Sequence, residues 1–433
     1  MEPETAAAMN NLAIALQLIG SEEQAEDLLI RALFIKENAK GPDHSDTALA
    51  LNNLAMLYTK IGSYNKAAPL YKRAFTIAKK SLAPKHPDFA TYLTNLALNH
   101  KRQGLYSQSS ELLERALIID KEKLGVNHLD TATSFNNLAS SYISQKIPKK
   151  AKLNYRSGMT ASLNISQREL PFLSIRDRNN FKIVLNQGWE SIFAAADKNK
   201  IYADLALFWR LNHQGLLQEI EKRQSRLSKA SGSELLIIKE LEGLITKKPF
   251  DNSQDVNHKN LISQKENLEK KLYRMLPELK PKITEIDQVA KTIPDNGLLV
   301  EFKRFYEYDN KNDKWNLQSS KYMALVLSSH GEVDVFDLGS TTVIEQTIEA
   351  ALKATSRNLA DQQKLWDEVS QLVIDPLAKQ LEGKDQIFIS PDGELNRVPF
   401  AALRSPQNRQ FLGEDKQLRL LSTGRELLEL SND

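Results

Sequence analysis

The stretch from Gln386 to Leu403, QIFISPDGELNRVPFAAL, decides how this chain folds. Ile387 to Ile389 form a short continuous apolar run, which is typical of a strand buried on both faces in a parallel sheet covered by helices. Pro391-Asp392-Gly393 then predicts a sharp turn, because proline fixes φ, aspartate bonds nearby backbone and glycine accepts a positive φ. The apolar residues between Leu395 and Leu403 return the chain to a core.

This segment resembles IxPDGxLxxLPFxAL, a stretch in the amino-terminal half of CHAT domains. CHAT domains are caspase-like domains that commonly follow tetratricopeptide (TPR) repeats. The resemblance implies an α/β fold in which a catalytic histidine and then a catalytic cysteine lie at the ends of later strands. Only Arg404 to Asp433 follow the segment, and they contain neither residue type. We therefore expect an incomplete CHAT domain, truncated before its catalytic half.

The composition narrows the classes of function. Lysine and arginine number 58 against 55 acidic residues, and a net charge of +3 gives no electrostatic reason to expect nucleic acid or an acidic membrane surface. No stretch approaches the roughly 18 consecutive apolar residues of a membrane span, and MEPETAAAMNNLA lacks the pattern of a secretion signal. The absence of cysteine excludes disulfides, thiolate metal sites and a cysteine nucleophile. We expect a soluble, cytoplasmic protein without a cofactor.

The first 160 residues or so repeat with a period of 42. Four leucines share this spacing, each preceded by asparagine and followed by alanine: Leu12, Leu54, Leu96 and Leu138. Each unit has the apolar pattern of helix, turn and helix, with glycine in the turn of the first three units. The pattern is similar to TPR arrays of the kinesin light-chain type, whose repeats are longer than the common repeat of about 34 residues.

The remaining chain divides into two further parts. Residues 170–293 keep helical patterns without the 42-residue period, and we expect helices at 177–197, 200–230, 233–246 and 257–276. Leu211 to Leu227 resembles the segment that joins repeats to the CHAT domain in cyanobacterial proteins of this type. Three strands at 297–305, 321–327 and 332–339 predict an antiparallel meander, with YEYDNKNDKWNLQSS as a loop, followed by helices at 342–354 and 359–381.

The expected fold is therefore mainly α, with three domains. A TPR α-solenoid of four repeats covers residues 1–169, and a helical connecting region covers residues 170–293. An incomplete α/β caspase-like domain, the amino-terminal part of a CHAT domain, covers residues 294–433.

Three histidines that lie 42 residues apart suggest a metal site: His44, His86 and His128. Equivalent points in stacked repeats are about 8–10 Å apart, whereas zinc holds each imidazole nitrogen at about 2.0–2.1 Å. The three side chains therefore cannot share one ion, and we expect no metal. We expect structural roles at the start of each helix, with three nearby aspartates as candidate caps: Asp46, Asp88 and Asp130.

The recurring asparagines are candidates for binding a peptide: Asn11, Asn53, Asn95 and Asn137. They lie on the first helix of each repeat, which lines the concave face in TPR proteins, and an amide can both donate to and accept from a peptide backbone. Hydrogen bonding between helices that fixes the stacking of repeats fits the sequence equally well. Lys60, Lys101 and Arg102 follow on the same helices and favour an acidic ligand, although a solvated rim also explains them.

These features predict that the protein is a scaffold. It would bind a protein or peptide ligand in the TPR groove and carry a catalytically incomplete CHAT domain. The sequence contains no G-x-S-x-G, H-E-x-x-H or G-x-x-x-x-G-K motif. The alternative is a caspase-like cysteine peptidase whose catalytic half is supplied by another chain or lost by truncation. A third possibility is an inactive regulator that pairs with an intact CHAT relative through its unfinished sheet.

Overall fold

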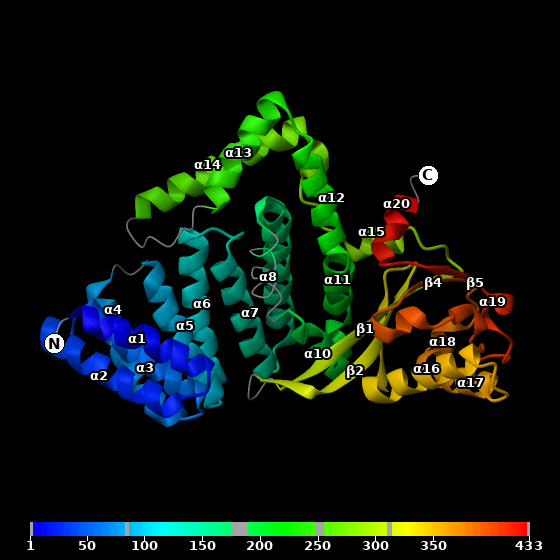
Figure 1. Ribbon diagram of the computed structural model, residues 1–433, viewed down its shortest axis with the longest axis horizontal. Coiled ribbons are helices and arrows are strands. Elements are labelled where there is room, and N and C mark those ends of the chain that lie inside the picture. Colours follow the sequence, from blue (N-terminus) through cyan, green and yellow to red (C-terminus); the bar gives the residue numbers. More distant parts are fainter. Residues whose placement is uncertain are drawn as a thin grey trace. The chain divides into compact units, whose positions relative to one another are not determined.

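The computed structural model describes residues 3–82, 86–174, 176, 178, 189–246, 255–309 and 314–430. The chain forms two compact units (Figure 1). Of the described residues, the first unit comprises 3–82, 86–162 and 255–264, and the second comprises 163–174, 176, 178, 189–246, 265–309 and 314–430. No helix in the described part of the chain is both long and apolar enough to cross a membrane.

Four consecutive helix pairs build the repeats within the described residues. Their bounds are α1 Pro3–Leu18, α2 Glu22–Lys40, α3 Ser45–Lys60, α4 Tyr64–Ser81, α5 Pro87–Arg102, α6 Tyr106–Lys123, α7 Leu129–Ser144 and α8 Pro148–Glu169. The turns inside the first three pairs use Gly20, Gly62 and Gly104 at φ of 79°, 79° and 78°, and Lys146 takes the equivalent place at 59°. Glycine adopts this left-handed conformation without steric cost, which explains its recurrence. The predicted order of helix, turn and helix is confirmed in all four units.

Small side chains let the paired helices approach closely. One column of the repeat, formed by Ala25, Ala67, Ser109 and Ala151, is fully buried in all four pairs. Successive pairs then stack through larger apolar residues, and Leu54 of α3 joins one cluster with Leu29 of α2 and Leu96 of α5. Each inner pair therefore buries its apolar side against its neighbours, as expected of a solenoid.

Further helices follow the repeats. Their bounds are α10 Ser191–Lys198, α11 Ala203–His213, α12 Leu216–Ser228, α13 Gly232–Thr246, α14 Asp255–Met275 and α15 Ile286–Ala290, with 3₁₀ turns η1 Leu170–Phe172, η2 Lys200–Tyr202 and η3 Pro277–Leu279. The predicted helix at 200–230 is wrong as one element, because Gly215 takes a φ of 73° and divides α11 from α12. Much of the predicted helix at 177–197 lies outside the described residues.

The described strands form one five-stranded mixed sheet in the order β3-β2-β1-β4-β5. The strands are β1 Gly297–Asp309, β2 Lys314–Ser328, β3 Val333–Ser340, β4 Gln386–Ser390 and β5 Gln417–Leu420. The first three form the predicted antiparallel meander, and β4 runs parallel to both β1 and β5. Ile387 to Ile389 in β4 are all buried, which confirms the prediction of a strand covered on both faces.

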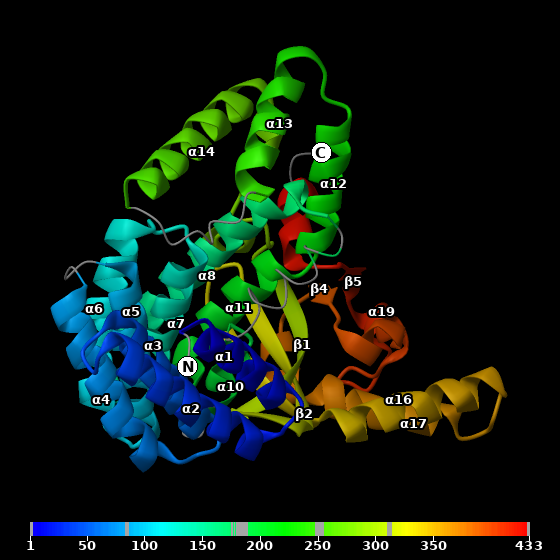
Figure 2. The ribbon, with the colours of Figure 1, turned by 60° about the vertical axis from the view of Figure 1, so that its left-hand side comes forward.

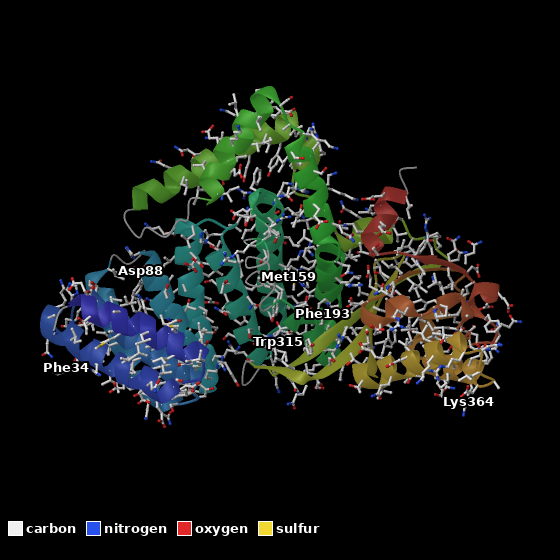
Figure 3. All side chains as sticks on the ribbon, in the orientation of Figure 1. Phe34, Asp88, Met159, Phe193, Trp315 and Lys364 are labelled. Carbon is white, nitrogen blue, oxygen red and sulfur yellow. The ribbon has the colours of Figure 1, made fainter. Side chains whose placement is uncertain are left out.

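Helices cover both faces of this sheet. Helices α16 Thr341–Ser356 and α17 Gln362–Val373 lie on one face, and α10 and α11 lie on the other (Figure 2). Phe193 of α10, labelled in Figure 3, is buried, and the Lys303 ammonium of β1 lies 5.2 Å from its ring centroid. Helices that the sequence assigns to the connecting region therefore share the compact unit of the sheet.

Two sequence expectations in this unit need correction. The predicted loop YEYDNKNDKWNLQSS is largely strand, because β1 and β2 continue as a hairpin in which the Tyr308 and Trp315 rings lie 4.7 Å apart. The predicted helix at 359–381 is interrupted by a 3₁₀ turn, η4 Asp375–Leu377, which contains Pro376. The remaining short elements are α18 Ala378–Leu381, α19 Leu412–Asp415, α20 Leu427–Leu430, η5 Gly393–Arg397, η6 Phe400–Ala402 and η7 Gly424–Glu426.

Candidate functional site

The first helices of the four repeats carry equivalent side chains that lie on one side of each helix. Each helix contributes residues at i, i+4, i+7 and i+11, a spacing that places them one above the other. We call this set the first-helix face: Ala7, Asn11, Ile14 and Leu18 of α1, Leu49, Asn53, Met56 and Lys60 of α3, Thr91, Asn95, Leu98 and Arg102 of α5, and Thr133, Asn137, Ser140 and Ser144 of α7.

The four candidate asparagines all belong to this face, but they differ in their partners. Asn95 Nδ2 donates to Oδ1 of the buried Asn52 at 2.9 Å, a bond that ties α5 to α3. The amides of Asn11, Asn53 and Asn137 make no hydrogen bond to another described part of the chain. Asn95 thus has the stacking role that the sequence left open, and the other three amides retain unused donors and acceptors.

The three candidate basic residues lie in different environments. Lys60 is exposed, and its ammonium donates to the backbone oxygen of Gln17. Lys101 is only 2% exposed and donates at 2.7 Å to Oγ of Ser140, a buried member of the face, so its ammonium joins α5 to α7 and is not open to a ligand. Lys101 precedes Arg102 by one residue, which turns its side chain about 100° away from the first-helix face. Arg102 is half-buried on the face.

Exposed apolar side chains on the same face were missed from the sequence. Ile14 and Met56 follow the asparagines of α1 and α3 by three residues and are 51% and 49% exposed. At the equivalent positions, Leu98 of α5 is partly buried and Ser140 of α7 is buried. The exposed apolar surface of the face therefore lies at the first two repeats. A comparison of the four residues that lie three positions after the asparagines would have shown that three of them are apolar. It would not have shown which of them are exposed.

The periodic histidines are helix caps. The Nδ1 atoms of His44, His86 and His128 accept hydrogen bonds from the backbone N–H of Asp46, Asp88 and Asp130 at 3.1, 3.2 and 3.2 Å. The predicted structural role is confirmed, but the histidine supplies the cap and the aspartate side chain does not. The described residues contain no group of three or more histidine, cysteine or acidic side chains that could hold a metal ion.

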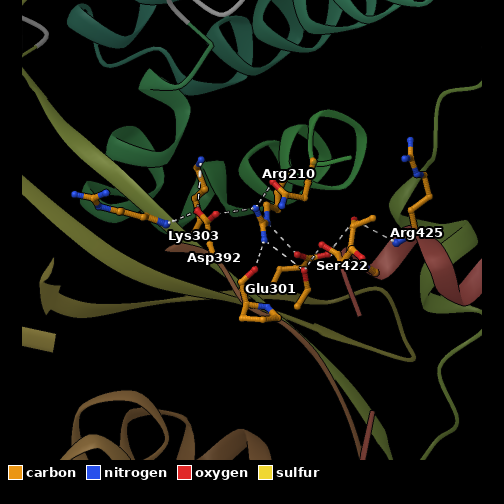
Figure 4. Close-up of polar contacts among 12 residues, drawn as sticks. Arg210, Glu301, Lys303, Asp392, Ser422 and Arg425 are labelled. Carbon is orange, nitrogen blue, oxygen red and sulfur yellow. Dashed lines mark hydrogen bonds and ion pairs between the residues drawn. The ribbon is translucent and has the colours of Figure 1, made fainter. Parts of the chain in front are cut away.

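A second polar constellation lies in the compact unit that contains the sheet, which we call the sheet unit. It gathers at the ends of β4 and β5, next to β1, the other neighbour of β4 (Figure 4). The side chains of Arg210 from α11 and Glu301 from β1 are 1% and 0% exposed, and Arg210 Nε lies 3.0 Å from Glu301 Oε2. Arg210 Nη2 also donates to the Pro391 backbone oxygen at 3.1 Å. Glu301 Oε1 accepts from the Gly424 backbone N–H at 2.5 Å. The ion pair therefore connects α11 and β1 to the segments that follow β4 and β5.

The Pro391-Asp392-Gly393 turn adjoins this pair. Asp392 accepts a hydrogen bond from the Arg304 backbone N–H at 2.9 Å and lies 3.7 Å from both Lys303 and Arg210. Gly393 has a φ of 56°, and a Cβ there would overlap the Tyr322 hydroxyl. The predicted turn and its need for glycine are confirmed, and Asp392 has a charged role that the sequence did not reveal. These groups satisfy one another, so the arrangement organises the strand ends and supplies no free nucleophile.

Comparison with known families agrees with this architecture of helical repeats followed by a mixed α/β sheet. A tetratricopeptide repeat model matches residues 4–80 and 88–163, and a CHAT domain model matches residues 362–433. The chain thus contains TPR repeats followed by a C-terminal CHAT domain, and its 433 residues include no cysteine.

Solved structures of TPR-like repeats are also similar. A Q17M crystal structure of nearly identical TPR-like repeats from Podosopora anserina, assigned to a kinesin light chain, is 19% identical over 53% of this chain and 100% of that chain, with a TM-score of 0.36. BtubC (BKLC) from P. vanneervenii is 20% identical over 52% of this chain and 82% of that chain, with a TM-score of 0.37. No curated protein matches the chain.

Proposed function

We propose that this protein is a scaffold whose TPR repeats bind a peptide or protein segment on the first-helix face. The observation that carries the proposal is the pairing of Asn11 and Asn53, whose amides have no partner among the described residues, with the exposed apolar side chains of Ile14 and Met56. Amides can hydrogen-bond a ligand backbone, and apolar neighbours give the ligand side chains a surface to bury.

The ligand is expected to place its apolar residues over the first two repeats. Leu18 and Leu49 extend the apolar region there and are 84% and 52% exposed. Arg102 on α5 provides the positive charge of the neighbouring repeat, and Lys101 is removed from the proposed set because it is buried. Asn95 and Asn137 are the corresponding amides of the third and fourth repeats. Asn95 already holds α5 against α3 through its bond to Asn52.

In the same proposal the sheet unit, which contains the CHAT match, has no peptidase activity of its own. Cysteine peptidases attack with a thiolate, and the 433 residues contain no cysteine. The buried Arg210–Glu301 pair and its partners are already bonded to one another and hold the strand ends together. The unit therefore acts as a structural or regulatory partner of the repeats.

The test is a selection from a displayed library of random peptides on the full chain, followed by fluorescence anisotropy with the selected peptide. Asn53→Ala and Met56→Ser should each weaken binding about tenfold, since each removes a contact at the centre of the site. Asn154→Ala is the matched control, because Asn154 is half-buried on α8, as Asn53 is on α3, and lies outside the first-helix face. Selected peptides that bind both variants as tightly as the parent chain would refute the proposed site.

One observation favours a second candidate, a peptidase completed by another chain. Strand β5 pairs only with β4 among the described strands and exposes 60% of Leu420. An open edge of this kind can accept a strand from another protein. Mixing the chain with an intact CHAT relative and measuring both complex size and peptide cleavage tests this candidate, and Leu420→Lys should prevent the complex. Absence of a complex would eliminate it.

A further inference from the structure

The outer side of the first helix pair exposes a leucine that every inner pair buries. Leu12 of α1 is 53% exposed, whereas its equivalents Leu54, Leu96 and Leu138 are 4%, 7% and 3% exposed. In the second pair, Leu54 packs in one cluster with Leu29 of the preceding helix α2. A leucine at this column is therefore normally covered by a helix of the adjacent pair, and no described residue provides that cover for Leu12.

A hollow of about 450 Å³ opens at this leucine. It is lined by three leucines and three polar residues: Leu12, Leu16, Leu28, Glu23, Gln24 and Asp27. We call these six residues the outer-pair face. Its lining thus combines three apolar side chains with two carboxylates. Arg31 lies 3.5 Å from Asp27, but both side chains are exposed, so this ion pair offsets little of the negative charge.

The apolar surface continues from the hollow along α2. Ile30 and Phe34 follow Asp27 by three and seven residues, which places them on the same side of the helix. They are 46% and 61% exposed, and Phe34 is labelled in Figure 3. A partner that follows α2 can therefore bury apolar side chains along several turns.

We propose that the outer-pair face is a docking surface for a basic amphipathic helix of a partner protein. The occupant is a helix because the equivalent leucine of the next pair packs against a helix, so docking here continues the stacking seen inside the array. Its apolar side faces Leu12, Leu16 and Leu28, in the manner of helices that lie in apolar grooves. Its flanking lysine or arginine side chains face Glu23 and Asp27, whose negative charge they complement.

A second copy of this chain fits the surface less well. Two outer-pair faces brought together would oppose Glu23 and Asp27 of one copy with the same carboxylates of the other, and like charges at close range disfavour association. The proposed surface also differs from the first-helix face. Loss of peptide binding at Asn53 and Met56 therefore leaves helix docking at Leu12 unaffected, and the two proposals fail independently.

The test uses a synthetic alanine-based peptide of about 18 residues, long enough to form a helix in water. It carries leucine at i, i+4, i+7 and i+11 with lysine on both flanks, and a matched peptide has glutamate in place of lysine. Fluorescence anisotropy with the full chain should show saturable binding of the lysine peptide alone. Leu12→Gln and Asp27→Lys should each weaken that binding about tenfold, as expected for central contacts.

The matched control is Ile118→Gln, since Ile118 is 56% exposed on α6 and lies outside the face. It should bind the lysine peptide as the parent chain does. Asp27→Lys removes only an exposed ion pair, so it retains the fold and keeps the test valid if Leu12→Gln unfolds. Equal binding of both peptides, binding that neither variant weakens, or no saturable binding would overturn the proposal. So would a dimer in sedimentation equilibrium that Leu12→Gln dissociates, because a second copy would then occupy the face.

Discussion

The compact unit of repeats and the sheet unit are held together by contacts that differ in the sequence separation of their partners. In the repeats, the stacking bond from Asn95 to Asn52 joins residues 43 positions apart, about one repeat. In the sheet unit, Arg210 binds Glu301 at a separation of 91 residues and Pro391 at 181. A defect in the repeats should therefore weaken one or two neighbouring pairs, whereas a defect at Arg210 should weaken the whole sheet unit.

The tryptophans allow the two units to be observed separately. All four lie in the sheet unit: Trp189, Trp209, Trp315 and Trp366. Tryptophan fluorescence therefore follows unfolding of the sheet unit alone, while circular dichroism at the helical band follows the helices of both units. A helical transition that tryptophan fluorescence does not show belongs to the repeats.

The largest expected effect is that of Glu301→Gln in the sheet unit. The substitution leaves the guanidinium of Arg210 buried without its carboxylate, and removal of one partner of a buried pair costs about 3–5 kcal/mol. We expect the urea midpoint followed by tryptophan fluorescence to fall, while the helical signal of the repeats persists. The control is Glu394→Gln, because Glu394 pairs with Arg397 at the surface, where such pairs contribute about 0–1 kcal/mol.

A double variant sharpens this prediction. Arg210→Met with Glu301→Leu removes both charges together, and apolar replacements of buried pairs are often close to neutral. The double variant should therefore be more stable than Glu301→Gln alone. If the double variant is the less stable of the two, the pair stabilises the unit through its own attraction and not merely by mutual neutralisation.

The second prediction compares one column of the repeat in two environments. Leu54→Ala should lower the free energy of unfolding of the repeats by about 2–5 kcal/mol, the usual cost of a cavity in a core. Leu12→Ala should cost no more than about 0.5 kcal/mol, as at most surface positions, because half of the Leu12 side chain is exposed. Urea unfolding followed by circular dichroism measures both. Equal costs would mean that Leu12 is covered in solution.

The local patterns of the sequence were enough for most of the fold. The 42-residue columns predicted the helix pairs, and the apolar run at Ile387 predicted the buried parallel strand, because both depend on periodicity and short turns. The hairpin that extends β1 and β2 was missed, since its polar residues are held by cross-strand aromatic contact between Tyr308 and Trp315. The break at Gly215 was missed because a single glycine is tolerated within many helical patterns.

The candidate site was less accessible to sequence analysis. The asparagine column was visible, but the partners of its members depend on neighbouring helices, as the bond from Asn95 to Asn52 shows. Lys101 was misplaced because its direction depends on a rotation of one residue around α5. The Arg210–Glu301 pair joins segments 91 residues apart, and no local pattern indicates a pairing of that range.

The third prediction concerns a buried carboxyl in the repeats. Asp120 of α6 is 5% exposed and accepts from Ser134 Oγ at 2.6 Å, and burial raises its pKa to about 6. The folded state thus holds the proton more tightly than the unfolded chain, so stability present below pH 4 is lost as the pH rises toward 6. The shift corresponds to a loss of up to about 3 kcal/mol.

Asp120→Asn provides the measurement. An amide keeps an acceptor for Ser134 but carries no charge to desolvate, so the variant should exceed the parent chain in stability above pH 6 and lose that advantage near pH 4. Urea midpoints from circular dichroism at both pH values give the difference, and the tryptophan signal of the sheet unit serves as the internal reference. A difference that is constant with pH would show that Asp120 titrates normally in the folded protein.

The smallest expected effect is the loss of one histidine cap, and it tests whether damage to the repeats stays local. His44 Nδ1 accepts from the Asp46 backbone N–H at 3.1 Å at the start of α3, and loss of a cap typically costs about 1 kcal/mol. His44→Ala should therefore lower the helical unfolding midpoint slightly, with hydrogen exchange increased in the first turn of α3 and unchanged in α7. His44→Asn should retain most of the stability, because asparagine is a strong cap. If asparagine costs as much as alanine, the imidazole stabilises the turn by packing and not as an acceptor. If α7 loses protection as well, the repeats respond as one cooperative body, and the contrast with the sheet unit fails.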